Sequence, residues 1–266
     1  MRLTDKEKQA ARILARKDLY FYSRYMFYIR KGYVWQKSPH HKIICDKLMQ
    51  VFRGEIKNLI INLPPRYSKT ELAVVNFISW AFGQYPDCEF IHSSYSSALA
   101  TNNSSQIRDM VLHDENKAIF PNLHLKDDSK AKDHWKTTQG GVMYATGAGG
   151  TITGFGAGKL RDGFGGAILL DDPHKADEAR SETMRANVIN WFTETIKSRR
   201  NDPSKTPIII IMQRLHENDL SGYLLAGNDD DNWQHLKLPA IQSDGTALWA
   251  QKHSIEKLHQ MQIASP

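Results

Sequence analysis

The segment of residues 58–71 constrains the fold more than any other part of the sequence. It reads NLIINLPPRYSKTE: an apolar run, a turn, and then Lys69-Thr70 at the start of a helical pattern. In a phosphate-binding loop, backbone N–H groups surround the phosphates, a lysine reaches the outer phosphate oxygens, and a hydroxyl group ligates Mg²⁺. Lys69 and Thr70 fit the last two roles. Leu63 and Ser68 replace the two glycines of the usual motif, so the strand–turn–helix context supports the prediction.

A second apolar run ends in two acids. Residues 165–173 read GGAILLDDP, and Pro173 stops the expected strand. P-loop NTPases need one carboxylate to hold Mg²⁺ and a nearby group to orient or activate the attacking water. Such a run is by itself more typical of a plain strand and a solvated turn, but downstream of a phosphate loop it predicts a Walker B strand. Asp171 is then the Mg²⁺ ligand and Asp172 the group that acts on water.

Strand and helix patterns alternate along most of the chain. Strands are expected at about 57–63, 88–95, 141–146, 166–171, 207–213 and 234–238. Helices are expected at about 3–30, 40–52, 69–83, 97–112, 177–199, 217–226 and 254–262. This alternation predicts an α/β fold with a mainly parallel sheet and helices on both faces.

The buried strand of residues 207–213 ends in polar residues, Gln213 and Arg214. In additional-strand P-loop ATPases, the RecA-like type, the strand after Walker B lies between the Walker A and Walker B strands. We therefore expect strand 207–213 between strands 57–63 and 166–171, all parallel. Ligands bind at the carboxyl edge of such sheets, so Gln213 and Arg214 are expected near the γ-phosphate. The alternative is that these residues only mark where the strand meets water.

Two further segments allow two interpretations each. Residues 144–158 contain six glycines, which can bring backbone close to a phosphate, act as a hinge, or form a flexible connection. The aromatic-rich helical pattern of residues 3–30 is more typical of a stripe that faces the core than of a surface that stacks nucleobases.

Composition limits the class of protein. The chain has 266 residues, of which 41% are hydrophobic, enough for one large domain or a domain with an appendage. It has no apolar run of about 18 residues and a charged N-terminus, so we expect an intracellular soluble protein without a membrane span or signal peptide. Cys45 and Cys88 show no pairing pattern, and the eleven histidines show no metal-binding spacing.

The balance of charge points weakly to an anionic partner. The formal net charge is +6, and nucleic acid is the commonest large polyanion. The basic residues are dispersed, however. The densest cluster, residues 197–200, either complements the end of a helix or contacts DNA.

Several motifs together resemble one protein family, the large terminase subunit of tailed bacteriophages. The matching segments, in order, are residues 64–71 (PPRYSKTE), 94–100 (SYSSALA), 140–141 with 147–154 (GAGGTITG), 170–173 (LDDP), 191–192 (WF) and 213–220 (QRLHENDL). The resemblance extends from about residue 35 to the end of the chain. It implies an ATPase motor that uses ATP and Mg²⁺ to move double-stranded DNA through a portal into a procapsid.

The resemblance also implies roles for individual residues. Lys69 is expected to act on the phosphates, Thr70 and Asp171 to hold Mg²⁺, Asp172 to be the catalytic acid, and Arg66 to act in cis on the γ-phosphate. The remaining nucleotide-binding residues are expected to be Pro65, Tyr67, Ser68, Glu71, Gln213, Arg214 and, for adenine, Gln36. Family members often have glycine where this chain has Ser68, and often Glu where it has Asp172, so reduced nucleotide affinity and a relayed or closer water are expected.

The resemblance suggests an organisation in three parts: a helical appendage (1–40), the ATPase domain (41–245) and a linker (246–266) toward a nuclease domain that the sequence does not include. No nuclease activity is therefore expected. The implied partners are double-stranded DNA, the portal protein and the small terminase subunit, with a ring on the portal, a monomer in isolation and no membrane contact. The implied location is the cytoplasm of the infected bacterial host. The alternative function is a helicase-like DNA-dependent ATPase, although the chain is short for the second RecA-like domain that a helicase needs.

Overall fold

The computed structural model describes residues 3–129 and 131–264. Residues 1–2 and 265–266, at the ends of the expected appendage and linker, lie outside the described residues. The helices are α1 (Asp5–Lys17), α2 (Leu19–Lys31), α3 (Pro39–Phe52), α4 (Phe77–Gln84), α5 (Ser97–Leu112), α6 (Asp114–Ile119), α7 (Glu182–Trp191), α8 (Leu220–Leu225) and α9 (Ile255–Ala264). Two π-helical turns, η1 (Glu71–Asn76) and η2 (Phe192–Ile196), and a 3-10 turn, η3 (Lys197–Arg199), adjoin them.

The described residues form one seven-stranded sheet. Its strands are β1 (Asn58–Asn62), β2 (Glu89–Ser94), β3 (His134–Lys136), β4 (Val142–Gly147), β5 (Ile168–Asp171), β6 (Ile208–Met212) and β7 (Trp233–Lys237). Their spatial order is β3-β4-β2-β5-β6-β1-β7, and every pair is parallel except β3 with β4. β6 therefore lies between β1 and β5, which confirms the predicted order.

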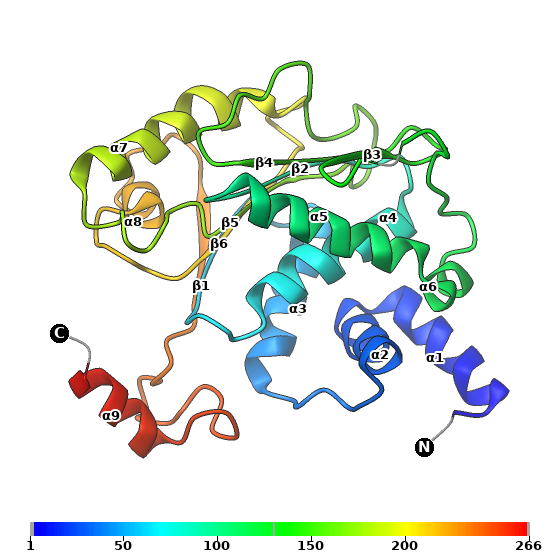
Figure 1. Ribbon diagram of the computed structural model, residues 1–266, viewed down its shortest axis with the longest axis horizontal. Coiled ribbons are helices and arrows are strands. Elements are labelled where there is room, and N and C mark those ends of the chain that lie inside the picture. The colour runs from blue at the N-terminus through cyan, green and yellow to red at the C-terminus, as the bar shows by residue number, and fades with distance from the viewer. Residues whose placement is uncertain (1–2, 130, 265–266) are drawn as a thin grey trace.

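Helices cover both faces of this sheet (Figure 1). Side chains of successive strand residues point to opposite faces, so each central strand serves two hydrophobic clusters. In β1, Leu59 and Ile61 join the cluster that includes residues of α1 to α5, whereas Ile60 joins the one that includes residues of α7, η2 and α8. Both faces of β1, β5 and β6 are buried, which explains why these strands read as uninterrupted apolar runs.

The aromatic N-terminal segment faces the core, as expected from its pattern. Tyr22 is fully buried, and its hydroxyl donates to Asn116 Oδ1 at 2.7 Å. The segment is two helices rather than one, because Asp18 ends α1 in an extended conformation and its carboxylate caps α2 by accepting from Phe21 N at 2.6 Å. Residues of α1 and α2 belong to the same buried cluster as residues of α3 and α4.

Close packing explains two glycines of the glycine-rich segment. A Cβ on Gly147, at the end of β4, would lie 2.8 Å from the backbone nitrogen of Ser97, which begins α5. Gly158 has φ +90°, and a Cβ there would lie 2.1 Å from Thr206 Oγ1. At these two positions glycine is required by contact with neighbouring elements.

His92 of β2 makes stability depend on pH. It is fully buried, with Nδ1 3.3 Å from Leu169 O and Nε2 3.1 Å from Asn103 Nδ2, so the neutral ring donates at Nδ1 and accepts at Nε2. Burial lowers the pKa of His92 from 6.5 to about 4. The unfolded chain therefore binds a proton first as the pH falls, and stability is lost from about pH 6.5 downwards.

We expect this loss to be roughly 1 kcal/mol between pH 7.5 and pH 5.5. Urea unfolding at the two pH values measures it. Because other groups titrate in the same range, the comparison is with His92→Gln, whose free energy of unfolding should fall less over this interval. Equal falls in both proteins would contradict the assignment.

Among the helices of residues 3–129 and 131–264, none combines the length and apolar character needed to cross a bilayer.

Candidate nucleotide-binding site

The loop between β1 and the following helix has the backbone of a phosphate loop without its glycines. Helical structure begins at Lys69, passes through η1 and continues into α4. Arg66 and Ser68 have φ values of +64° and +66°, in the left-handed region. This conformation costs a non-glycine residue about 1–2 kcal/mol. Ser68 thus adopts the conformation that favours the glycine of the usual motif, despite its Cβ.

Lys69 and Asp172 form an ion pair at the carboxyl edge of the sheet. Lys69 is 6% exposed, and its Nζ lies against Asp172 Oδ2. The other carboxylate oxygen of Asp172 accepts from Gln213 N at 3.2 Å. The backbone of Asp172, at φ +45°, donates to Ile211 O at 2.8 Å and accepts from Tyr95 N at 3.0 Å. Asp172 therefore connects the phosphate loop with the ends of β2 and β6.

Thr70 and Asp171 lie together beside this ion pair. Thr70 Oγ1 donates to Asp171 Oδ2 at 2.7 Å. Asp171 is 2% exposed, and burial, reinforced by the charge of Asp172, raises its pKa to about 7. Its Oδ1 is buried and has no hydrogen-bond partner among the described residues.

These oxygens fit a divalent cation. Mg²⁺ prefers oxygen ligands and is usually bound through one or two carboxylates together with phosphate oxygens and water. The orphaned Asp171 Oδ1 and the adjacent Thr70 hydroxyl are ligands of that type, and a cation would offset the cost of burying the carboxylate. Asp171 and Thr70 are therefore the residues that would hold Mg²⁺.

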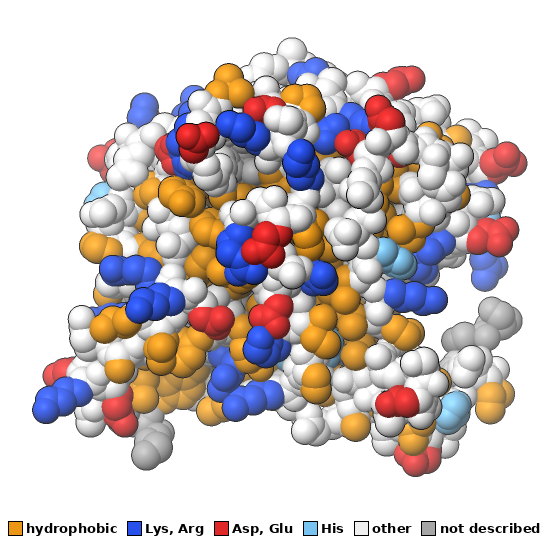
Figure 2. All heavy atoms as spheres, turned by 180° about the vertical axis from the view of Figure 1, so that it is seen from behind, with side chains coloured by type: hydrophobic (Ala, Val, Ile, Leu, Met, Phe, Trp, Pro, Cys, Tyr) orange, Lys and Arg blue, Asp and Glu red, His pale blue; other side chains and the backbone are white. Residues whose placement is uncertain are grey.

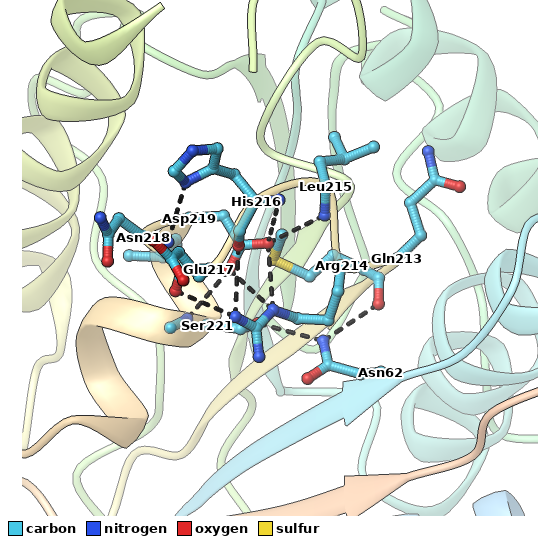
Figure 3. Close-up of polar contacts among 12 residues, drawn as sticks. Asn62, Gln213, Arg214, Leu215, His216, Glu217, Asn218, Asp219 and Ser221 are labelled. Atoms are coloured by element: carbon cyan, nitrogen blue, oxygen red, sulfur yellow. Dashed lines mark hydrogen bonds and ion pairs between the residues drawn. The ribbon is translucent and has the colours of Figure 1, made fainter. Parts of the chain in front are cut away.

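Gln213 and Arg214 diverge at the end of β6 (Figure 3). The Gln213 side chain extends away from the group around Arg214, and its backbone nitrogen bonds Asp172. The Arg214 guanidinium donates to Asp219 Oδ2 at 3.1 Å and to the Glu217 carbonyl at 3.0 Å. Arg214 was expected near the γ-phosphate. The structure shows its guanidinium held by the fully buried Asp219 in the turn before α8, and its role at the γ-phosphate stays a prediction.

The other predicted residues lie in different surroundings. Pro65 and Arg66 are exposed, whereas the Tyr67 ring is buried. Glu71 is engaged by Arg30 Nη1 of α2 at 3.0 Å, a partner that the sequence does not reveal. Gln36 is exposed in the segment between α2 and α3, where its adenine role stays a prediction.

A cleft of about 280 Å³ opens at this edge of the sheet. Its lining includes Pro65 from the loop, Gln213 and Arg214 from the end of β6, and Lys237 from the end of β7. It brings together residues that are distant in the chain, at the edge where ligands bind in open α/β sheets.

Two contacts to the loop were not predicted from the sequence. His40, at the start of α3, has Nε2 3.2 Å from Tyr67 O, and Lys252 Nζ donates to Arg66 O. No local signal points to them, since these partners are 27 and 186 positions apart.

The fold and the site together define a P-loop ATPase fold of the RecA-like, additional-strand type. Lysine, hydroxyl and two carboxylates converge at the ends of β1 and β5, with β6 between them. This arrangement can bind a nucleotide phosphate at Lys69, a divalent cation at Thr70 and Asp171, and an attacking water near Asp172.

Known structures share this fold. The crystal structure of the HK97 bacteriophage large terminase matches with a TM-score of 0.53 and 14% sequence identity, over 86% of this chain and 44% of that chain. The large terminase of a thermophilic bacteriophage, in complex with ADP, matches with a TM-score of 0.51 and 15% identity, over 85% of this chain and 50% of that chain.

These matches confirm the fold expected from the terminase resemblance, and at such identities they show the fold alone. The chain spans about half the length of these terminases. No protein-family model and no curated protein matches the sequence.

Proposed function

We propose that this chain is the ATPase motor domain of a viral large terminase, which hydrolyses ATP to move double-stranded DNA into a procapsid. The observation that supports it best is the convergence of Lys69, Thr70, Asp171 and Asp172 at the carboxyl edge of β1 and β5. For a scaffold or DNA-binding protein without catalysis, the meeting of these four residues at one edge of the sheet would be a coincidence. The terminase folds described above, one of them determined with ADP, agree with the proposal.

In this proposal each residue has a defined task. Lys69 leaves Asp172 to bind the β- and γ-phosphates. Thr70 and Asp171 hold Mg²⁺, which when bound neutralises developing charge on the phosphate oxygens. Asp172, once released, orients or activates the attacking water. Gln213 is attached to Asp172 through its backbone nitrogen at 3.2 Å, so a movement of Asp172 on nucleotide binding reaches the end of β6.

ATP turnover by the purified chain tests the proposal. We expect hydrolysis by the isolated chain to be slow, because such motors are complete only as a ring assembled on a portal around DNA. Turnover should increase when double-stranded DNA is added. Absence of turnover with and without DNA, together with absence of nucleotide binding, would refute the proposal. Unwinding of a forked duplex without a portal would favour the helicase-like alternative.

DNA contact is proposed to be weak and sensitive to salt. On the face shown in Figure 2, Lys and Arg side chains are interspersed with Asp and Glu rather than gathered in one patch. Binding through scattered phosphate contacts depends on counterion release and weakens steeply with salt concentration.

We further propose that this chain does not cut DNA. A two-metal nuclease needs several carboxylates free to hold ions. Among the described residues, one acidic group has suitable spacing, Asp229, Asp230 and Asp231. Lys197 engages all three, with Nζ at 2.8, 2.7 and 3.2 Å from the carboxylates, and Arg200 pairs with Asp231, so none of the three is free of a basic partner. Supercoiled plasmid incubated with the chain and Mg²⁺ or Mn²⁺ should therefore stay intact.

Arg66 is proposed to stabilise the transition state in cis. Its side chain is exposed, with no ion pair among the described residues, and it projects from the phosphate loop itself. Arginines that meet the γ-phosphate can contribute about 10³–10⁵ in rate. In Arg66→Ala we expect kcat to fall by far more than ATP affinity, measured by phosphate release and calorimetry. The exposed Arg53→Ala is the matched control, and equal losses of affinity and kcat in Arg66→Ala would assign Arg66 to loop structure.

A further inference from the structure

Two successive carbonyl groups of the phosphate loop are held from outside the loop. Lys252, from the segment that follows β7, donates to Arg66 O, and His40 Nε2 lies 3.2 Å from Tyr67 O. A carbonyl oxygen can only accept, so Nε2 of His40 bears the proton. Burial lowers the pKa of His40 to about 4, and the ring is therefore neutral, with Nδ1 2.7 Å from Ser38 Oγ.

These two contacts fix the direction of two backbone N–H groups. In a planar trans peptide the C=O and the following N–H point to opposite sides, and none of the described peptide bonds is cis. Holding Arg66 O and Tyr67 O toward Lys252 and His40 therefore turns the N–H groups of Tyr67 and Ser68 the other way. Neither N–H donates a hydrogen bond to any described residue.

Unpaired successive N–H groups in this conformation form an anion-binding concavity. Two residues in the left-handed region, Arg66 at φ +64° and Ser68 at φ +66°, flank Tyr67, whose φ is not positive. Neither residue is a glycine, so the loop does not adopt this shape freely. Such strain persists only where the surroundings over-determine the backbone.

The residues that hold the carbonyls are themselves fixed. The Trp249 ring packs against the rings of Tyr67 and His40, with centroids 5.8 and 5.4 Å apart. Ser38 Oγ lies 2.9 Å from Leu248 O and 2.7 Å from His40 Nδ1, so its one proton is shared between these two acceptors, and the contact joins the start of α3 to the segment after β7. The Lys252 ammonium lies 5.0 Å from the centre of the Trp249 ring. These contacts therefore join three segments that are distant in the sequence: the start of α3, the phosphate loop and the segment after β7.

We propose that His40 and Lys252 are positioning residues of the phosphate site: by holding the carbonyls of Tyr67 and Arg66, they aim the N–H groups of Ser68 and Tyr67 at the nucleotide phosphates. They replace the conformational freedom that glycines supply in the usual motif. This inference rests on the proposed nucleotide-binding function of the same loop, and it adds two residues from outside the motif to it.

The test uses variants that keep shape and remove only the donor. His40→Phe retains a ring against Trp249, and Lys252→Met retains the aliphatic stem. Each should raise the Kd for ATP about three- to tenfold, the effect of one lost hydrogen bond. Affinity for adenosine, measured by competition with a fluorescent ADP, should not change, because the affected N–H groups face phosphate. Lys252→Arg, whose side chain can still donate to Arg66 O, should bind ATP like the parent.

The matched controls are the exposed α9 residues in His259→Phe and Lys257→Met, which should bind ATP like the parent. A stronger prediction concerns strain: adding Ser68→Gly to His40→Phe should recover part of the lost ATP affinity, because glycine adopts positive φ without the anchor. Thermal unfolding of each variant separates loss of folding from loss of binding.

The outcomes separate this inference from the proposed function. If the parent binds ATP and both variants bind it equally well, or lose adenosine as much as ATP, the positioning role is wrong while the ATPase proposal stands. If the parent itself does not bind ATP, both are wrong.

Discussion

Lys69→Ala is expected to abolish ATP binding by this chain. Lys69 is the buried cation at the carboxyl edge of the sheet, and its Nζ faces Asp172 directly. Without it, the triphosphate would approach two carboxylates, Asp171 and Asp172, with no fixed positive charge between them. Loss of such a preorganised charge costs about 10²–10³-fold or more. Calorimetric titration with ATP should show no measurable binding, and phosphate release should fall to background.

The control for this variant lies at the end of β1 opposite to the phosphate loop. Lys57 is exposed just before β1, so Lys57→Ala removes the same type of charge without touching the loop. It should bind and hydrolyse ATP like the parent. Thermal unfolding should show that Lys69→Ala is folded, because Asp172 is partly open to solvent and can be hydrated when its partner is lost. ATP binding by folded Lys69→Ala with the affinity of the parent would remove the phosphate loop from the proposal.

The sequence was sufficient for the central sheet because burial on both faces leaves a clear pattern. The strands β1, β2, β5 and β6 were located to within about two residues, and the order of β1, β6 and β5 followed from the motif types. The three-residue antiparallel strand β3 was missed, since it is too short for alternation to show. The helix predicted from residue 177 begins at Glu182, because Ser181 caps it by accepting from Met184 N.

The residues of the candidate site likewise divide into those that the sequence predicted and those that it could not. Lys69, Thr70, Asp171 and Asp172 meet because strand topology alone brings their elements together. The ion pair of Arg214 with Asp219, a carboxylate five residues further along the chain, was not predicted. His40 and Lys252 could not be found, because their carbonyl partners are backbone atoms and leave no mark on residue type.

Ser68 shows how a departure from a motif can be interpreted physically. Its Cβ led us to expect reduced nucleotide affinity, and the residue adopts φ +66°, the conformation that favours glycine. The motif is therefore preserved as a backbone shape rather than as a residue type. The conformational energy that a serine costs at positive φ must be offset by other interactions. The nearest interactions that can do so are the contacts to Arg66 O and Tyr67 O.

Asp172→Asn is expected to separate binding from hydrolysis. Asparagine tolerates the positive φ of +45° seen at this position, and its side-chain oxygen can still accept from Gln213 N. The substitution removes the charge that holds Lys69 in the resting protein, so ATP affinity should be equal to that of the parent or higher. It also removes the group that acts on the attacking water, so turnover should fall by about 10²–10³-fold or more.

This pattern is the opposite of that expected for Lys69→Ala, and the two variants together test the division of roles within one ion pair. Calorimetry gives the affinity, and single-turnover phosphate release gives the rate of the chemical step. Asp202→Asn, in the loop before β6, is the matched control. Asp202 stabilises only a turn with Ser204, so this variant should leave both the ATP affinity and the rate of the chemical step unchanged. If Asp172→Asn hydrolysed ATP as fast as the parent, Asp172 would be only the resting partner of Lys69, and the catalytic group would have to come from elsewhere, such as a neighbouring subunit.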